Sequence, residues 1–145
     1  MTAEIHTDKG LMKVVFFAED APITVENFVK LAKSGYYDGV MFHRVIDNFM
    51  VQTGDPTGTG TGGPGYTITD ELDGGNQFHD RGVLSMANTG RPNSGGSQFF
   101  ICHSRMNTKH LDRKHTVFGK VIEGLDVVDE IRQGDRMTKI VVVED

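Results

Sequence analysis

The chain has 145 residues, of which 37% are hydrophobic and 24% charged, and its formal net charge is −5. This length fits one domain spanning residues 1–145, long enough to bury a core without disulfides. The acidic balance and the lack of clustered lysine and arginine argue against nucleic-acid binding. The single cysteine, Cys102, excludes an intrachain disulfide, which is compatible with a reducing compartment.

The sequence also bears on location and assembly. The first residues lack a basic segment followed by an apolar run, so no signal peptide is predicted. No apolar run approaches the length needed to cross a bilayer. We therefore expect a cytoplasmic protein without membrane contacts. The sequence contains no obvious dimerisation element, so we expect a monomer.

In chain order, the first clear elements are an apolar strand at 11–17 and a helix after it. Pro22 suits the first turn of that helix, Gly35 suits its end, and the apolar residues between them recur at helical spacing. A second helix is expected at about 125–132, with Gly134 as its stop. Further β-branched and aromatic runs predict strands at 82–86, 98–101, 117–121 and 139–143.

Many short strands, two helices and 18 glycines indicate a mainly β fold. A closed antiparallel barrel with helices at its open ends is expected, and a β-sandwich is the alternative. The stretch 53–80 is rich in Gly, Thr and Asp and is predicted to be a long loop with one short strand near 66–68. Loops of this length are usually functional or mobile.

The most informative segment is 42–52, with the sequence FHRVIDNFMVQ. On a strand, Met50 and Gln52 point to the same face, and so do Gln98 and Phe100 on a second strand. A surface that combines Phe, Met and two glutamines near Arg44 suits a ligand with one apolar point and amide groups around it. A proline in an extended peptide fits that description. The simpler interpretation of Arg44, a surface partner for Asp47 or Asp55, does not account for its neighbours.

Three other patterns in the sequence resemble functional motifs but do not predict a site. The run 58–63 matches G-x-G-x-x-G, but Pro64 and Gly65 follow it and cannot open the helix that a dinucleotide site requires. We expect instead a tight, hydrated connection with close backbone approach. Ser97 lacks the glycine two residues later that a nucleophile elbow needs, so a hydrolase is not expected. The six histidines show no zinc-ligand spacing, so no metal site is predicted.

These segments together resemble the cyclophilins, a family of peptidyl-prolyl cis-trans isomerases. The resemblance covers nearly the whole chain. Within the family, the chain is most similar to compact prokaryotic single-domain members. Its motifs occur in the family's order, at 22–28, 42–55, 82–88, 93–101, 111–115 and 117–121. The resemblance implies a closed eight-stranded antiparallel β-barrel capped by two α-helices, with the active groove on its outer face. It also implies isomerisation of X-Pro bonds without a cofactor or metal.

The resemblance assigns roles by matching positions. Arg44 corresponds to the catalytic arginine. The proline pocket corresponds to Phe49, Met50, Phe100, Leu111 and His115. The residues expected to hold the peptide backbone are Gln52, Asn88 and Gln98, helped by Gly60, Ala87 and Thr89. The implied partners are proline-containing peptides and unfolded or flexible protein segments.

The chain departs from the family pattern at three positions. His110 stands where many members have a tryptophan that is tied to tight binding of cyclosporin, so weakened cyclosporin affinity is expected. Thr89 replaces a more common alanine and Pro56 a usual aromatic, and both could tune the preference for residues around the proline. The leading alternative function is a proline-peptide binding or scaffold module with incidental turnover. A nucleotide-binding enzyme that uses the glycine run is a distant third hypothesis.

Overall fold

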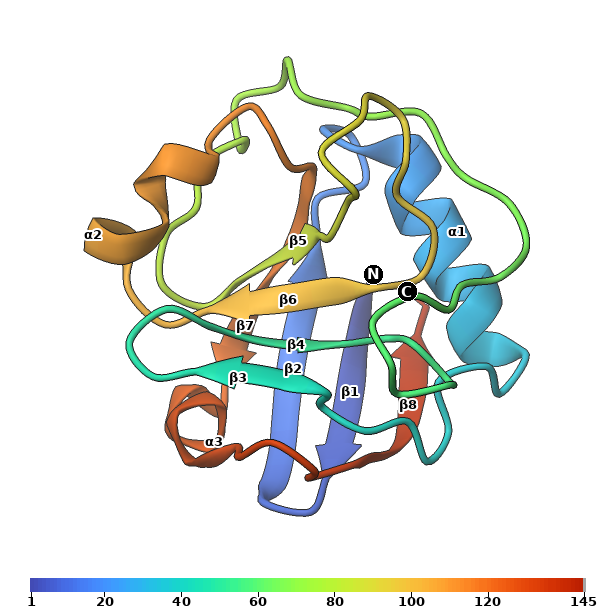
Figure 1. Cartoon of the computed structure of the whole chain (residues 1–145), viewed down its shortest axis with the longest axis vertical. Coiled ribbons are helices and arrows are strands. Elements are labelled where there is room, and N and C mark those ends of the chain that lie inside the picture. The colour runs from blue at the N-terminus through green and yellow to red at the C-terminus, as the bar shows by residue number, and fades with distance from the viewer. Residues whose placement is uncertain (145) are drawn as a thin grey trace.

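The computed structural model describes residues 1–144, and its main feature is one strongly curled antiparallel sheet (Figure 1). The strand order is β3-β4-β6-β5-β7-β2-β1-β8. The strands are β1 (Thr2–Thr7), β2 (Gly10–Phe16), β3 (Arg44–Ile46), β4 (Met50–Thr53), β5 (Val83–Met86), β6 (Phe99–Cys102), β7 (Val117–Glu123) and β8 (Met137–Val143). The helices are α1 (Pro22–Lys33), α2 (Arg105–Thr108) and α3 (Leu125–Glu130), with a 3-10 turn, η1 (Lys109–Leu111).

The mainly β, eight-stranded antiparallel fold is confirmed, but the closed barrel is wrong. Strands β3 and β8 form the two edges of the sheet, so the sheet is an open half-barrel. The two edges approach each other before β3 begins, where residues 39–42 make four backbone hydrogen bonds with residues 134–137 and Met41 forms an isolated bridge with Arg136. Because β3 is only three residues long, no ladder with β8 develops within the described chain.

The prediction of two helices was also incomplete, since residues 1–144 contain three. The first helix begins at Pro22, and Gly35 adopts φ of 81° just after its end, as expected. Helix α2 has only four residues, too few to show a helical period in the sequence. Helix α3 ends at Glu130 rather than at about 132, because Ile131 already has extended backbone angles.

The main core lies inside the curled sheet and is covered by α1. Phe28 of α1 is 1% exposed, and its ring centroid lies 5.2 Å from those of both Phe99 and Phe118. The apolar stripe of α1 is buried because it faces these aromatic rings, which supplies most of the drive to form the helix.

A second, smaller apolar cluster lies on the outer face of the same strands. Successive residues of a strand point to opposite faces. In β6, Phe99 and Ile101 therefore belong to the main core, whereas Phe100 and Cys102 belong to this outer cluster. Met50, Val83 and Val117 complete its buried part. We call these five residues the outer cluster. Burial on both faces explains why β6 reads as a continuous apolar run.

The long connection between β4 and β5 is tied to the start of α1 (Figure 1, green). Glu71 accepts hydrogen bonds from the backbone N of Ile23 and Thr24, at 3.1 and 2.7 Å. These are two of the unpaired N–H groups at the start of the helix, and Ala21 at the N-cap has no side chain able to bond them. Asp20 accepts from Asn76 N at 3.2 Å. Much of the predicted loop is thus anchored, and an isolated bridge between Ile68 and Gly95 stands where a short strand was expected.

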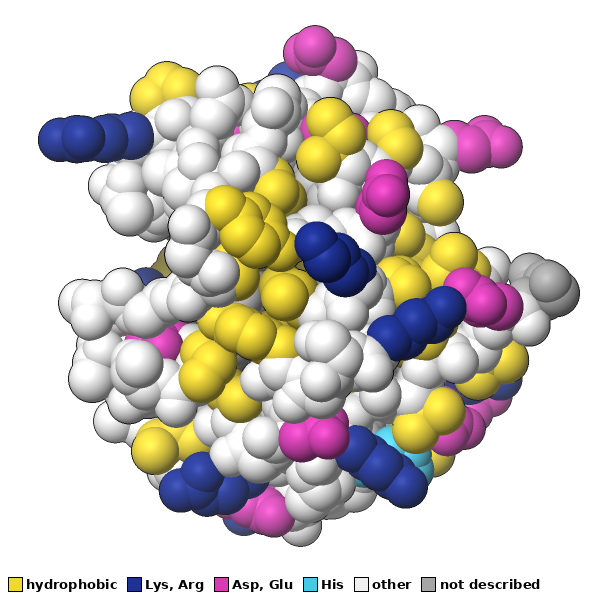
Figure 2. Space-filling model, turned by 90° about the vertical axis from the view of Figure 1, so that its right-hand side faces the viewer, with side chains coloured by type: hydrophobic (Ala, Val, Ile, Leu, Met, Phe, Trp, Pro, Cys, Tyr) yellow, Lys and Arg dark blue, Asp and Glu magenta, His cyan; other side chains and the backbone are white. Residues whose placement is uncertain are grey.

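Surface charge is mixed on the face shown in Figure 2. Acidic and basic side chains alternate there, and hydrophobic side chains collect in a hollow between them. Among the described residues, no helix is long and apolar enough to cross a membrane.

Candidate active site

Arg44 and the side chains beside it form one row across four strands of the outer face. The register places Arg44 of β3 opposite Gln52 of β4, Gln52 opposite Phe100 of β6, and Phe100 opposite Ser85 of β5. Directly opposed residues have side chains on the same face of a sheet. A cation, an amide and an aromatic ring therefore lie side by side because of strand pairing alone.

An apolar pocket of about 270 Å³ opens beside this row. Its floor is the outer cluster, through Met50 and Phe100, which are 2% and 4% exposed. Arg44 is exposed at its edge. The lining residues are Arg44, Phe49, Met50, Gln52, Ala87, Asn88, Phe100, Leu111 and His115. The five residues predicted to hold a proline ring thus lie together around one cavity, next to Arg44.

Three polar side chains form a hydrogen-bonded series that ends at Arg44. Gln98 Nε2 donates to the carbonyl oxygens of Gly60 and Gly62, both at 3.0 Å. Its oxygen accepts from Gln52 Nε2 at 3.1 Å, and Gln52 Oε1 accepts from Arg44 Nη1 at 3.4 Å. Because the two carbonyls can only accept, they fix which way the Gln98 amide faces, and this fixes the Gln52 amide in turn. The orientation of the Arg44 guanidinium therefore depends on the glycine-rich loop, through Gln98 and Gln52.

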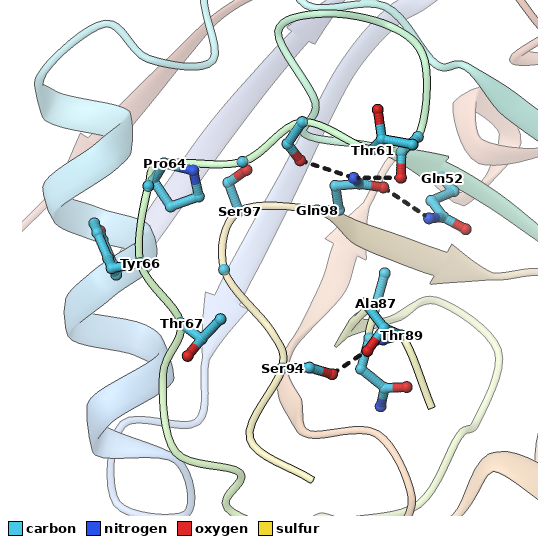
Figure 3. Close-up of a pocket in the computed structure, with 16 residues that line it drawn as sticks. Gln52, Thr61, Pro64, Tyr66, Thr67, Ala87, Thr89, Ser94, Ser97 and Gln98 are labelled. Carbon is cyan, nitrogen blue, oxygen red and sulfur yellow. Dashed lines mark hydrogen bonds between the residues drawn. The ribbon is translucent and has the colours of Figure 1, made fainter. Parts of the chain in front are cut away.

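A larger and more polar cavity, of about 660 Å³, adjoins the first one (Figure 3). The two cavities share Gln52, Ala87 and Asn88. Gly60, Thr89 and Gln98, which were predicted to contact the peptide, lie here rather than around the apolar pocket. The cavity also takes in residues that the sequence analysis did not select: Thr61, Gly62, Gly63, Pro64, Gly65, Tyr66, Thr67, Ser94, Gly96 and Ser97.

Asp55 organises the glycine-rich wall of this larger cavity. It is fully buried, and its carboxylate accepts hydrogen bonds from backbone N of Thr57, Gly60 and Gly62 at 2.9, 2.7 and 3.0 Å. Burial alone raises the pKa of a carboxyl, but the bonds from the Thr57 hydroxyl and from these amides outweigh it and hold the pKa of Asp55 well below its ordinary value. In the sequence, the alternation of Gly and Thr after Asp55 is the pattern that could have predicted this hydrogen-bonded loop.

The glycine run contains the close backbone approach that was expected of it. A Cβ on Gly62 would lie 2.1 Å from Asp55 Oδ1, so only glycine fits there. The next regular element after the run is strand β5, not a helix. The arrangement is therefore not the strand–loop–helix unit of a dinucleotide site. Among the described residues, no group of three or more His, Cys, Asp or Glu side chains is placed to hold a metal ion.

Two histidines border the apolar pocket in different ways. His115 Nδ1 lies 2.8 Å from Met86 O, so this nitrogen carries the proton. Burial lowers the pKa of His115, with the Met86 carbonyl opposing the shift, and the ring is therefore neutral at pH 7. His110 stacks on Phe49, with ring centroids 5.9 Å apart. It thus supports one wall of the pocket without lining it.

Comparisons with known proteins agree with this geometry. Residues 2–145 match the model of the family described as cyclophilin type peptidyl-prolyl cis-trans isomerase/CLD. A peptidyl-prolyl cis-trans isomerase of Synechococcus elongatus is 52% identical over 99% of this chain and 97% of its own length. Peptidyl-prolyl cis-trans isomerase B of Bacillus subtilis is 50% identical over 92% of this chain and 91% of its own.

A solved structure supports the fold as well. The crystal structure of a cyclophilin type peptidyl-prolyl cis-trans isomerase of Cryptosporidium parvum, in the presence of the dipeptide Ala-Pro, superposes with a TM-score of 0.91. The two sequences are 34% identical, and the match covers 100% of both chains. The family model and the relatives each span nearly all of the sequence, so this chain belongs to the cyclophilin-type peptidyl-prolyl cis-trans isomerase family.

Proposed function

We propose that this protein catalyses cis-trans isomerisation of X-Pro peptide bonds in flexible or unfolded protein segments, and so assists folding. The observation that carries the proposal is the position of Arg44, exposed at the edge of an apolar pocket and oriented by Gln52. The family relatives bear this activity in their names, and the solved relative was crystallised with a prolyl dipeptide.

The chemistry requires a group that acts on the transition state. Rotation about a peptide bond costs roughly 18–20 kcal/mol because amide resonance is lost, and uncatalysed X-Pro exchange takes tens to hundreds of seconds. In the twisted state the proline nitrogen becomes pyramidal and regains a lone pair. An arginine N–H directed at this nitrogen stabilises the twisted state but not the planar one, which is the condition for catalysis.

The site divides the remaining work between its two cavities. The apolar pocket holds the proline ring, and the amides of Gln52, Gln98 and Asn88 hold the flanking backbone, so that one part rotates against the other. A rate gain of about 10⁵ corresponds to roughly 7 kcal/mol. One well-placed donor supplies about 3–4 kcal/mol of this, and positioning supplies the remainder. No acid, base or cofactor enters the scheme.

The experiment is two-dimensional NMR exchange on a short X-Pro peptide, with the wild type, Arg44→Ala and Arg44→Lys. We expect acceleration by the wild type, a loss of about 10²–10³-fold in kcat/KM for Arg44→Ala, and nearly unchanged peptide Kd. Arg44→Lys keeps the charge but lacks the forked N–H donors, so only partial activity is expected. Arg91→Ala removes the same charge from outside both cavity linings and serves as the control.

The competing function is a module that binds proline-containing peptides without turning them over. Binding needs the apolar pocket but not the guanidinium, so peptide affinity without wild-type acceleration would establish the module and exclude the enzyme. We further propose that the protein acts as a cytoplasmic monomer, on the basis of its composition and single cysteine. Sedimentation at cellular concentration and cell fractionation test these two points.

A further inference from the structure

His79 lies directly behind the apolar pocket and lines neither cavity. Its side chain is fully buried. The ring stacks on Phe100, with centroids 5.9 Å apart and planes at 17°, and meets the His115 ring edge-on, with centroids 6.3 Å apart. It thus contacts two of the pocket walls from the side that a ligand cannot reach.

Both ring nitrogens of His79 have hydrogen-bond partners, of which Ser85 is buried and Asp112 half-buried. Nδ1 lies 3.0 Å from Asp112 Oδ1, and Nε2 lies 2.7 Å from Ser85 Oγ. The Asp112 carboxylate also accepts from Arg105 Nη2 at 2.8 Å. Burial opposes its ionisation, but the bonds from Arg105 and His79 outweigh burial and lower the pKa of Asp112 to about 2. An ionised carboxylate only accepts, so Nδ1 carries the proton and Nε2 accepts from the Ser85 hydroxyl.

The order Ser85–His79–Asp112 matches the hydrogen bonds of a hydrolase triad, but it cannot serve as one. Ser85 is fully buried, and Phe100 lies opposite it in the register. A nucleophile must reach a substrate carbonyl, and this hydroxyl has no path to either cavity. The role of the arrangement must therefore be to fix the rings around it.

The backbone of His79 holds the third wall of the pocket. Its N–H donates to Asp112 Oδ1 at 2.7 Å, and its carbonyl accepts from Thr108 Oγ1 at 2.7 Å. Thr108 ends α2, and Asp112 directly follows Leu111. These two bonds tie the segment that carries Leu111 to the same residue whose ring contacts Phe100 and His115.

We propose that His79 is a positioning residue, whose neutral ring and backbone set the spacing of Phe100, Leu111 and His115 and so the shape of the proline pocket. Phe100 lies on β6, Leu111 on η1 and His115 in the bend before β7, and strand pairing alone does not bring these three segments together. A misplacement of about 1 Å at a reacting site can cost 10²-fold in rate. The inference rests on the proposed function for its kinetic readout, but not for its binding readout.

The test compares three variants of the full chain. His79→Phe keeps a ring against Phe100 and loses both ring hydrogen bonds. His79→Asn keeps a donor toward Asp112 and loses the stacking. His103→Asn is the matched control, because His103 is also buried but its ring contacts Val128 O of α3. For each variant we would measure peptide Kd, kcat and KM by NMR, under conditions where all variants are more than 99% folded. Urea unfolding, measured separately, identifies those conditions.

We expect both His79 variants to raise KM and peptide Kd by about 10-fold or more while the control changes stability alone. His79→Asn should keep more affinity than His79→Phe if the Asp112 bond sets the Leu111 wall. Unchanged Kd and KM in folded His79 variants would overturn the proposal, because a purely structural histidine affects only unfolding. If the wild type binds peptide without accelerating exchange, the proposed function fails, and Kd alone still decides the role of His79.

A spectroscopic test covers the case in which the variants do not fold. In the wild type, ring ¹⁵N shifts should show His79 protonated at Nδ1, and these signals should move when a prolyl peptide fills the pocket. The charged or titratable groups facing this ring are Asp112, Arg105 and His115, so their signals are followed in the same titration. A proton on Nε2 of His79, or ring ¹⁵N shifts that do not change when the peptide is added, would contradict the proposal.

Discussion

The two adjoining cavities are built in different ways. The apolar pocket has its floor on side chains of paired strands, Met50 and Phe100, and a second layer behind them that includes His79. The larger cavity is walled mostly by backbone and small side chains of residues 60–67, which are held from behind by the Asp55 carboxylate. Packing therefore fixes the first cavity, whereas hydrogen bonds to backbone amides fix the second.

This difference suits the proposed chemistry. The group that must be gripped, the proline ring, is the same in every substrate, and a packed apolar pocket is matched to one shape. The residues that flank a proline vary among substrates, and a polar cavity with water can accept several of them. The following predictions test the division, from the largest expected effect to the smallest.

Phe100→Ala removes the buried ring shared by the pocket floor and the outer cluster. We expect a loss of about 3–5 kcal/mol in the free energy of unfolding, together with weaker peptide binding. Urea unfolding and peptide titration measure the two effects. Tyr66→Ala, in the wall of the larger cavity and already 41% exposed, should change stability by no more than about 1 kcal/mol. Equal losses in the two variants would contradict the comparison.

Gly62→Ala places a methyl group against the Asp55 carboxylate. The overlap should force the loop outward and lower stability by about 1–3 kcal/mol. Because the Gly62 carbonyl orients Gln98, kcat should fall as well. Gly63→Ala is the matched control, since nothing lies within 4 Å of a Cβ at that neighbouring position. Crystal structures and kinetics of both variants check this, and an unaltered kcat for Gly62→Ala argues against the hydrogen-bonded series to Arg44.

Acid should act in two separate pH windows. Burial lowers the pKa of His79 from 6.5 to about 4, with Asp112 opposing the shift. The unfolded chain therefore binds more protons than the folded chain between these values, and stability falls as pH decreases from 6.5 to 4. Asp112, with its pKa lowered from 3.8 to about 2, contributes stability that is lost only below pH 4.

Activity should be independent of pH above neutrality. His79 and His115 are neutral there and arginine keeps its charge, so kcat/KM should be flat from about pH 7 upward. It should decline in acid as the histidines become protonated, with the pKa of His79 lowered to about 4 by burial. Urea unfolding and NMR exchange at each pH measure the two profiles. A steep bell centred near neutrality would show that an acid or base takes part, and the Arg44 mechanism would need revision.

His110→Trp should have the smallest effect on turnover. His110 stacks on Phe49 without lining the pocket, so kcat/KM for a short peptide should stay within about 2-fold, as for most surface substitutions. The family resemblance leads us to expect tighter cyclosporin binding by this variant. Calorimetry with cyclosporin checks the second point, and an unchanged affinity would mean that other residues determine it.

Local chemistry made much of this site predictable from the sequence. The period of a strand placed Met50 with Gln52, and both line the apolar pocket. It also placed Gln98 with Phe100, but Gln98 precedes β6 and lines the larger cavity instead. Pro22 and Gly35 marked the limits of α1 because their backbone preferences are intrinsic. Family resemblance placed Leu111 and His115 with them, although they come from distant parts of the chain.

The remaining features depend on long-range geometry that no local pattern encodes. Whether a sheet closes depends on the length and direction of its edge strands, and here β3 is too short. His79 gave no signal, since a lone histidine in a loop carries no period or motif. The wall formed by Thr61 to Thr67 was missed because its contribution comes from backbone groups, which every residue has.

The capping of α1 by Glu71 has a consequence for the order of events during synthesis. The helix leaves the ribosome 47 residues before its capping carboxylate. Its first turn therefore lacks partners until the long connection has been made and has docked. Docking in turn involves Thr116, whose hydroxyl oxygen accepts from Glu71 N at 3.0 Å, so it comes after most of the chain has been translated. We expect the nascent chain to secure this helix late, when contacts of large sequence separation form together.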